Sequence, residues 1–168
     1  MLHELIANFL TEPAAESYLA LRQAVLSSPA YQPASDVLYR FSESVRAGQV
    51  EQAELHRQRL FPTFLLTPRA HGDYGDLLLL QGDPKGQQLE YDFARQLAEF
   101  LMQSGDGSPQ RPYQISCVED EFYILHRLQR RTRGPSVRWF EGRLLDVQHT
   151  DSGDVHFDIH PLMQGYPA

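Results

Sequence analysis

The sequence has 168 residues, of which 42% are hydrophobic and 11% aromatic, so the chain can form a packed core and is not expected to be disordered. Its formal net charge of −7 argues against a general nucleic-acid binder, which needs a basic surface, and against a protein of anionic membrane surfaces. The single cysteine, Cys117, cannot form an internal disulfide or a cysteine-based zinc site. The start of the sequence lacks a signal-peptide pattern, and no apolar run approaches the ~20 residues of a membrane span. We therefore expect a cytoplasmic protein.

Apolar residues recur at helical spacing through the first 103 residues. Together with capping and turn residues, this spacing predicts helices that begin near Leu2, Pro13, Ser35, Gln49, Pro68 and Pro84. The apolar loop 61–68 is expected to pack under these helices. His71, which follows this loop, is expected to be a buried, hydrogen-bonded histidine.

Two glycines that end predicted helices, Gly48 and Gly82, lie 34 residues apart, which is the period of tetratricopeptide repeats. When that pattern is aligned on each turn, Ala53, Gly75 and Ala94 fall at positions for small residues, whereas most other signature positions do not match. The sequence is consistent both with degenerate tetratricopeptide-like hairpins and with ordinary antiparallel helices whose spacing is a coincidence. A stable array needs about three repeats, so the C-terminal part is expected to cover the last helix.

The stretch Ser104-Gly-Asp-Gly-Ser-Pro109 ends the helical part, because its glycines and proline favour a turn. Residues 113–117 then alternate as in a half-buried strand, with Cys117 on the apolar side as an inert core thiol. Ser116 and Glu119 have the spacing of a capping box for a helix over 118–129.

Residues 145–149 and 155–159 alternate again and predict a β-hairpin. Their apolar side chains lie on one face if Val147 is opposite Phe157, which leaves the three-residue loop 151–153.

We therefore predict an α+β fold in which N-terminal antiparallel helical hairpins pack on a small, three-stranded, mostly antiparallel sheet with one short helix. The chain is expected to form a single domain, 1–168. Its helical part comprises residues 1–103, and its α/β tail comprises residues 104–168.

Several short motifs occur one after another along the chain. They are Leu66-Thr-Pro-Arg-Ala-His71, Gly82-Asp83, Ser104-Gly-Asp-Gly-Ser-Pro109, Pro112-Tyr113, Ile115-Ser116, Glu119-Asp-Glu-Phe-Tyr-Ile-Leu125, Asp146 and Val155-His-Phe-Asp-Ile159. From about Tyr18 onward, the chain resembles a bacterial family known as a domain of unknown function, in which tetratricopeptide-like helices precede an SGDG-containing α/β tail. The resemblance implies an architecture only, since the family has no activity or catalytic residues to carry over.

The predicted hairpin register has a consequence for the polar face of the hairpin. It places Asp146 opposite Asp158, and two carboxylates that face each other across a ladder repel unless a cation or protonated neighbours relieve them. His156 and His160 flank Asp158 on the same face. These imidazole and carboxylate groups suggest a divalent-metal site. The alternative is a solvated polar face, and nothing else in the sequence calls for a cofactor.

Arginines interrupt the otherwise acidic sequence at positions Arg127, Arg130, Arg131, Arg133, Arg138 and Arg143. They could bind an anionic partner or a phosphate. Alternatively, they complement the end of a helix and keep a sheet edge soluble.

The sequence lacks the nucleophile-elbow, zinc-protease, paired-cysteine and phosphate-loop motifs of common enzymes, so we lean against an enzyme. The first hypothesis is a non-enzymatic interaction module whose helical hairpins bind a protein partner or a second copy of the chain, without nucleic acid or membrane. Its candidate contact residues are Tyr39, Tyr91, Arg130, Arg131 and Arg133. The second hypothesis is a metal-binding protein or metal-dependent hydrolase. Its candidate ligands are Asp146, His156, Asp158 and His160.

Overall fold

The computed structural model describes residues 2–163 and divides the chain into two compact units, Met1–Ala98 and Glu99–Ala168. The division falls a few residues before the Ser104–Pro109 stretch, at which the sequence changes character. The first unit is helical and the second combines helices with a sheet, so the predicted α+β class is confirmed.

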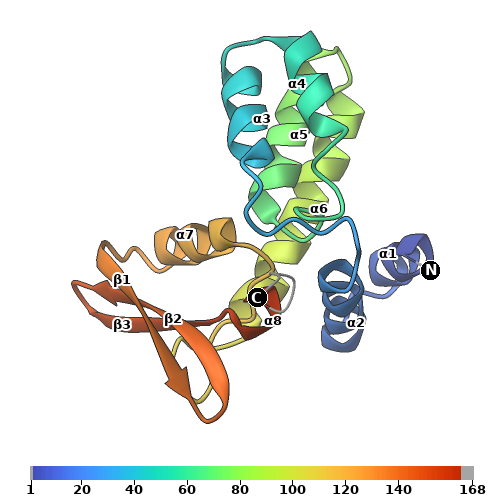
Figure 1. Ribbon diagram of the computed structural model, residues 1–168. Helices are drawn as coiled ribbons and strands as arrows, with labels where there is room; N and C mark the ends of the chain where they lie inside the picture. Colours follow the sequence, from blue (N-terminus) through green and yellow to red (C-terminus); the bar gives the residue numbers. More distant parts are fainter. Residues whose placement is uncertain (1, 164–168) are drawn as a thin grey trace. The chain divides into compact units, whose positions relative to one another are not determined.

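Helices make up most of the first unit (Figure 1). Their bounds are α1 (Leu2–Thr11), α2 (Ala15–Leu26), α3 (Val37–Arg46), α4 (Val50–Arg57), α5 (Pro68–Leu80) and α6 (Pro84–Gln103), of which α6 continues into the second unit. Each helix lies where the periodicity and capping residues predicted it. The fourth is shorter than expected, because residues 58–60 form turns rather than a last helical turn.

Glycines end α3 and α5, as the sequence predicted. Gly48 and Gly82 have φ angles of 68° and 84°, which is a left-handed conformation that costs glycine little. After Gly48 the Gln49 amide donates to the Ser44 carbonyl (2.9 Å), and the equivalent bond follows Gly82. The chain reverses at both points, so α3 and α4 form one antiparallel hairpin and α5 and α6 form another (Figure 1).

His71 ties the loop before α5 to both helices of the second hairpin. Its Nε2 donates to the Leu65 carbonyl (2.8 Å), and its Nδ1 lies 2.7 Å from a carboxylate oxygen of Glu90 on α6. The buried ring stacks on Phe61 and meets Phe93 edge-on. The expectation of a buried, hydrogen-bonded histidine is therefore confirmed, as is the packing of the apolar loop, whose residues 63–68 are buried.

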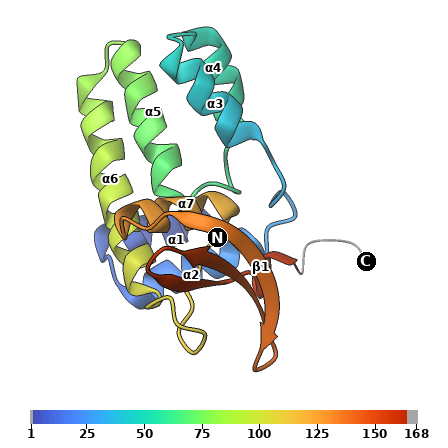
Figure 2. The same cartoon turned by 90° about the vertical axis from the view of Figure 1, so that its left-hand side faces the viewer.

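The second unit combines helices with a three-stranded sheet (Figure 2). Its elements are α7 (Val118–Arg127), β1 (Thr132–Phe140), β2 (Arg143–Thr150), β3 (Gly153–Asp158) and α8 (His160–Met163). The strand order is β1-β2-β3, and both neighbouring pairs are antiparallel. The predicted helix over 118–129 and the three-stranded antiparallel sheet are thus confirmed.

The third strand of the sheet is formed by a different segment from the one that the sequence predicted. Residues 113–117 do not form a strand, although Tyr113 makes an isolated bridge to Phe157. The third strand is β1, in which the Gly134-Pro135 pair had indicated a break. An edge strand tolerates proline where its missing N–H would point away from the sheet, and β1 is such an edge strand.

The β2–β3 register also differs by one residue from the predicted one. Val147 pairs with His156 rather than with Phe157, and the loop has two residues, 151–152. Because successive side chains of a strand point to opposite faces, Val147 shares one face with His156 and Phe157 shares the other with Asp146. The prediction assumed one apolar and one solvated face, but Val147 and Phe157 are both buried, so both faces of these strands are covered.

Backbone groups of residues 107–113 cover the outer edge of β3. The Gly107 carbonyl accepts a hydrogen bond from the His156 amide (2.9 Å). Further along, the Tyr113 amide donates to the His156 carbonyl (3.0 Å), and the Tyr113 carbonyl accepts from the Asp158 amide (2.9 Å). One edge of the sheet is therefore satisfied, and the open edge is that of β1.

Candidate functional site

The outer edge of β1 pairs with no described strand. Glu141 and Gly142, with φ angles of 47° and 77°, form the tight turn between β1 and β2. In a hairpin with such a two-residue turn, the flanking residues, here Phe140 and Arg143, exchange both backbone hydrogen bonds. Counting back from Phe140, every second residue of β1 bonds to β2. The residues between them direct their backbone groups outward, and these are Pro135, Val137 and Trp139.

Only the first half of this edge is protected. Pro135 lacks the N–H that would otherwise point outward, and a bulge shifts the register between Thr132 and Gly134. Both are features by which natural sheets avoid edge-to-edge aggregation. The second half of the strand has neither, so the outward amides of Val137 and Trp139 are available to an additional strand.

Large apolar side chains accompany these two amides. Val137 is 59% exposed and Trp139 is 66% exposed, and both lie on the same face of β1. Trp139, the single tryptophan of the chain, meets His160 edge-on with ring centroids 5.7 Å apart. Neither residue was among the contact residues predicted from the sequence. The available signal was the alternation of polar and apolar residues in Ser136-Val-Arg-Trp139 beside the arginine run.

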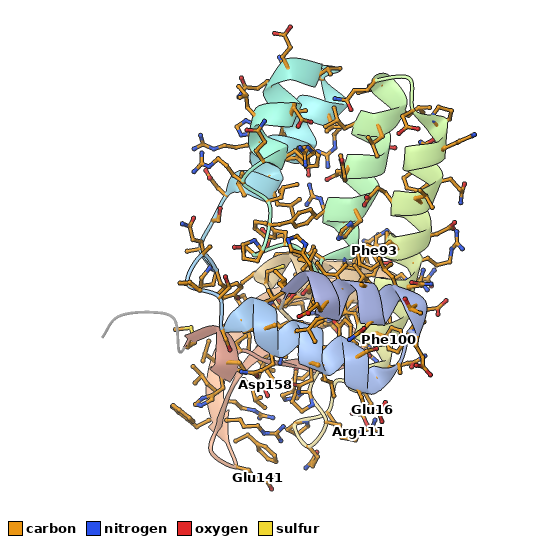
Figure 3. All side chains as sticks on the ribbon, turned by 90° about the vertical axis from the view of Figure 1, so that its right-hand side faces the viewer. Glu16, Phe93, Phe100, Arg111, Glu141 and Asp158 are labelled. Carbon is orange, nitrogen blue, oxygen red and sulfur yellow. The ribbon has the colours of Figure 1, made fainter. Side chains whose placement is uncertain are left out.

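Arginines are frequent in the sequence around β1. Six occur from residue 127 to residue 143, and the one acidic residue among them is Glu141, which Figure 3 labels. Arg131 and Arg133 are exposed and Arg130 is half-buried. Within residues 2–163, none of the six lies within ion-pair distance of a carboxylate. The segment that contains β1 therefore carries positive charge that no described carboxylate pairs, in a chain whose formal charge is −7.

The four residues predicted as metal ligands do not share a site. In the observed register, Asp146 and Asp158 lie on opposite faces of the sheet. Both ring nitrogens of His156 are engaged, since Nε2 accepts from Arg138 (2.5 Å) and Nδ1 donates to the Gly107 carbonyl (2.8 Å). Residues 2–163 contain no group of three or more histidine, cysteine or acidic side chains that could hold a metal ion. The predicted cluster, Asp146, His156, Asp158 and His160, depended on a register that differs from the observed one, and the structure does not bring these four residues together.

A pair of carboxyl groups instead lies between α7 and β2. Glu121 of α7 is fully buried, and Gln148 Nε2 donates to its Oε2 (3.0 Å) and to Asp146 Oδ2 (3.4 Å). The other two oxygens, Glu121 Oε1 and Asp146 Oδ1, are buried and have no hydrogen-bond partner among the described residues. Burial, followed by the charge of Asp146, raises the pKa of Glu121 to about 8. Glu121 is closed to solvent, and its hydrogen bond from Gln148 joins α7 to β2.

The cap of α7 is one residue later than predicted. Cys117 is the N-cap, and Asp120 rather than Glu119 is the capping carboxylate. Asp120 Oδ2 accepts from the amide and the hydroxyl of Ser116 (2.9 Å each) and from the Cys117 amide (3.3 Å). Burial raises the pKa of Asp120 to about 6, against the effect of these hydrogen bonds. Cys117 is buried and forms no disulfide, as expected.

The two tyrosines predicted as contact residues lie on different hairpins of the helical unit. Tyr39 on α3 is 61% exposed. Tyr91 on α6 is less exposed, its hydroxyl donates to Asp76 on α5, and its ring lies against Gly75. Helix packing therefore accounts for the position of Tyr91. A shallow hollow on α4 is lined by Gln49, Val50, Glu51, Gln52 and Leu55.

Comparison with known proteins gives no match to a protein-family model, a curated protein or a solved structure. The resemblance to a bacterial domain-of-unknown-function family, and with it the tetratricopeptide relationship, stays a prediction. In the part of the chain that the structure describes, no helix has the length and apolar character needed to cross a membrane.

Proposed function

We propose that this chain is a non-enzymatic interaction module that binds a protein partner at the open edge of β1. The observation that carries the proposal is the coincidence of unpaired outward amides and exposed apolar side chains at Val137 and Trp139. A strand of another protein can hydrogen-bond to such an edge, and its side chains then contact those of the edge strand.

The reactive groups of the C-terminal unit support a binding role rather than a catalytic one. Glu121 and Cys117 are buried, and both ring nitrogens of His156 are engaged in hydrogen bonds. A catalytic acid, base or nucleophile must reach its substrate. These side chains instead hold α7, the β3 edge and the loop before them together.

The helical unit supports the same class of function less specifically. Tyr39 on α3 and Leu55 on α4 are large side chains that are more than half exposed. Single exposed apolar residues are common on protein surfaces, however, and they carry no information about a partner. The β1 edge differs because its exposed side chains stand beside backbone groups that a strand would pair.

The proposal is tested by selecting peptides from a random displayed library on the full chain, with Val137→Pro as the comparison protein. Proline removes the outward amide at this position and leaves the β1–β2 ladder intact, because the ladder uses the neighbouring residues. Val137→Thr is the matched control, since it alters the side chain but keeps the amide. We expect selected peptides to bind the wild type and Val137→Thr, and to bind Val137→Pro about tenfold more weakly or worse.

Two results would overturn the proposal. One is a selection that enriches no peptide above background. The other is a set of peptides that bind wild type, Val137→Thr and Val137→Pro with equal affinity. Circular dichroism and thermal unfolding of each variant establish that a loss of binding does not come from a loss of the fold.

A further inference from the structure

We propose that the partner is an acidic, extended protein segment that adds to β1 as a fourth strand of the sheet. This inference rests on the proposed function and names the partner's chemistry. It uses the direction of the backbone groups, the exposed side chains and the charge of the edge together.

The charge of the segment that contains β1 indicates which kind of partner would bind there. From residue 127 to residue 143 there are six arginines and one glutamate, and none of the arginines is paired with a described carboxylate. A second copy of this chain would bring the same arginines against one another, and like charges across an interface are unfavourable. An acidic segment would neutralise them, and opposite charges also increase the association rate. The favoured occupant is therefore a different, acidic chain.

The backbone fixes where each part of that segment would lie. The outward N–H groups of Val137 and Trp139 would donate to carbonyl groups of the added strand, and the outward carbonyls of the same residues would accept from it. Arg131 and Arg133 lie toward the opposite end of β1, where Pro135 and the bulge weaken pairing. The acidic residues of the partner should therefore concentrate at this end.

The same geometry sets the length of the segment. From Arg131 to Trp139 an extended strand covers about 26 Å, at about 3.3 Å per residue. A segment of about seven to nine residues would span the edge. Apolar residues at alternate positions should lie opposite Val137 and Trp139, since side chains on one face of neighbouring strands are in contact.

The test uses three synthetic, end-capped nonapeptides. The acidic probe alternates valine with glutamate, and the basic probe has lysine in place of glutamate. The blocked probe is the acidic one with alternate backbone amides methylated, so that it keeps its charge but cannot pair with a strand. Because Trp139 is the only tryptophan and lies on the edge, its emission reports binding directly in the full-length chain.

We expect the acidic probe to bind and to shift the Trp139 emission toward the blue, since docking removes the indole from water. The basic and the blocked probes should bind at least about tenfold more weakly. Arg133→Glu should weaken binding of the acidic probe by about tenfold, whereas the same change at another exposed arginine, Arg59 on the helical unit, should leave it unchanged. Binding of the acidic probe should weaken with added salt.

Three results would overturn the inference. They are equal binding of the acidic and basic probes, equal binding of the blocked probe, and preferential binding of a single-stranded oligonucleotide at Trp139. If the displayed library yields peptides that depend on the Val137 amide but are not acidic, the inference fails and the proposed function stands. If neither the library nor the acidic probe gives binding that depends on this amide, both fail.

Discussion

Replacing Glu121 by glutamine should remove a pH dependence from the stability of the C-terminal unit. Glu121 of α7 is fully buried, beside Asp146 and the amide of Gln148. Burial and the charge of Asp146 raise its pKa from 4.5 to about 8. Between these values the folded chain holds a proton that the unfolded chain has released. The free energy of unfolding must therefore fall as the pH rises, and the fall ends above the folded-state pKa.

The size of this loss of unfolding free energy follows from the release of one proton from Glu121. The slope is at most about 1.4 kcal/mol per pH unit, so the whole interval corresponds to a loss on the order of 5 kcal/mol. Asp120, whose pKa burial raises to about 6, acts in the same direction, but most of its contribution is lost by about pH 6.5. The window from about pH 6.5 to about pH 8 therefore isolates Glu121, and within it the wild type should lose about 2 kcal/mol.

Urea unfolding at constant ionic strength measures this loss, with Trp139 emission and circular dichroism as probes. Glutamine at position 121 keeps the shape and a hydrogen-bond donor at every pH, so Glu121→Gln should lose the slope. The matched control is Glu119→Gln on the same helix, which should retain the wild-type slope, and the histidines common to all three proteins cancel in the comparison. Parallel profiles for wild type and Glu121→Gln across this window would refute the reasoning.

Three further substitutions have expected effects on stability. A Cβ at Gly105 would lie 2.5 Å from the Pro112 carbonyl oxygen, so Gly105→Ala should destabilise the chain by about 2 kcal/mol or more. At Gly72 in α5 a Cβ would meet nothing within 4 Å, so Gly72→Ala should be neutral or stabilising by up to about 1 kcal/mol; equal effects in urea unfolding would contradict both statements. His71→Leu removes the donor to the Leu65 carbonyl and the partner of the Glu90 carboxylate, and should cost about 2–4 kcal/mol in the same assay. A loss below about 0.5 kcal/mol would show that the bonds of His71 contribute little.

The helices could be predicted from the sequence because their signals are local. Gly48 and Gly82 end helices through their own φ angles. Asp83 accepts a hydrogen bond from the Gly86 amide (2.9 Å) at the start of α6, and Pro68 opens α5, as their types indicated. Each of these effects involves residues within a few positions of one another. Local propensity therefore identifies them without knowledge of the tertiary structure.

The sheet could be predicted only in outline, because its details depend on what covers each face. Alternation identified β2 and β3, but the register was chosen to collect Val147 and Phe157 on one face. In the structure both faces of these strands are covered, so that constraint does not hold. A shift of one residue exchanges the faces of a strand. The predicted pairing of Asp146 with Asp158, and with it the metal site, was lost for this reason.

The candidate site was predicted in part. The arginine run was identified from its composition, but β1 itself was missed because Gly134-Pro135 resembles a helix breaker more than a strand. Whether proline fits a strand depends on the direction of its missing N–H. That direction follows from the turn at Glu141-Gly142 and the register with β2, which the sequence of β1 alone does not contain.

The exposure of Val137 and Trp139 separates folding from binding at this edge. Side chains that keep 59% and 66% of their surface in solvent contribute little apolar burial to the fold, so polar residues at these positions would cost the sheet little. Pro135 and the bulge protect only the part of the edge that precedes Val137 and Trp139. Substitutions at Val137 and Trp139 should thus change partner binding far more than unfolding free energy, which is the opposite of the expectation for Glu121. Variants of the two sites can therefore distinguish a binding edge from an edge that is merely the end of a sheet.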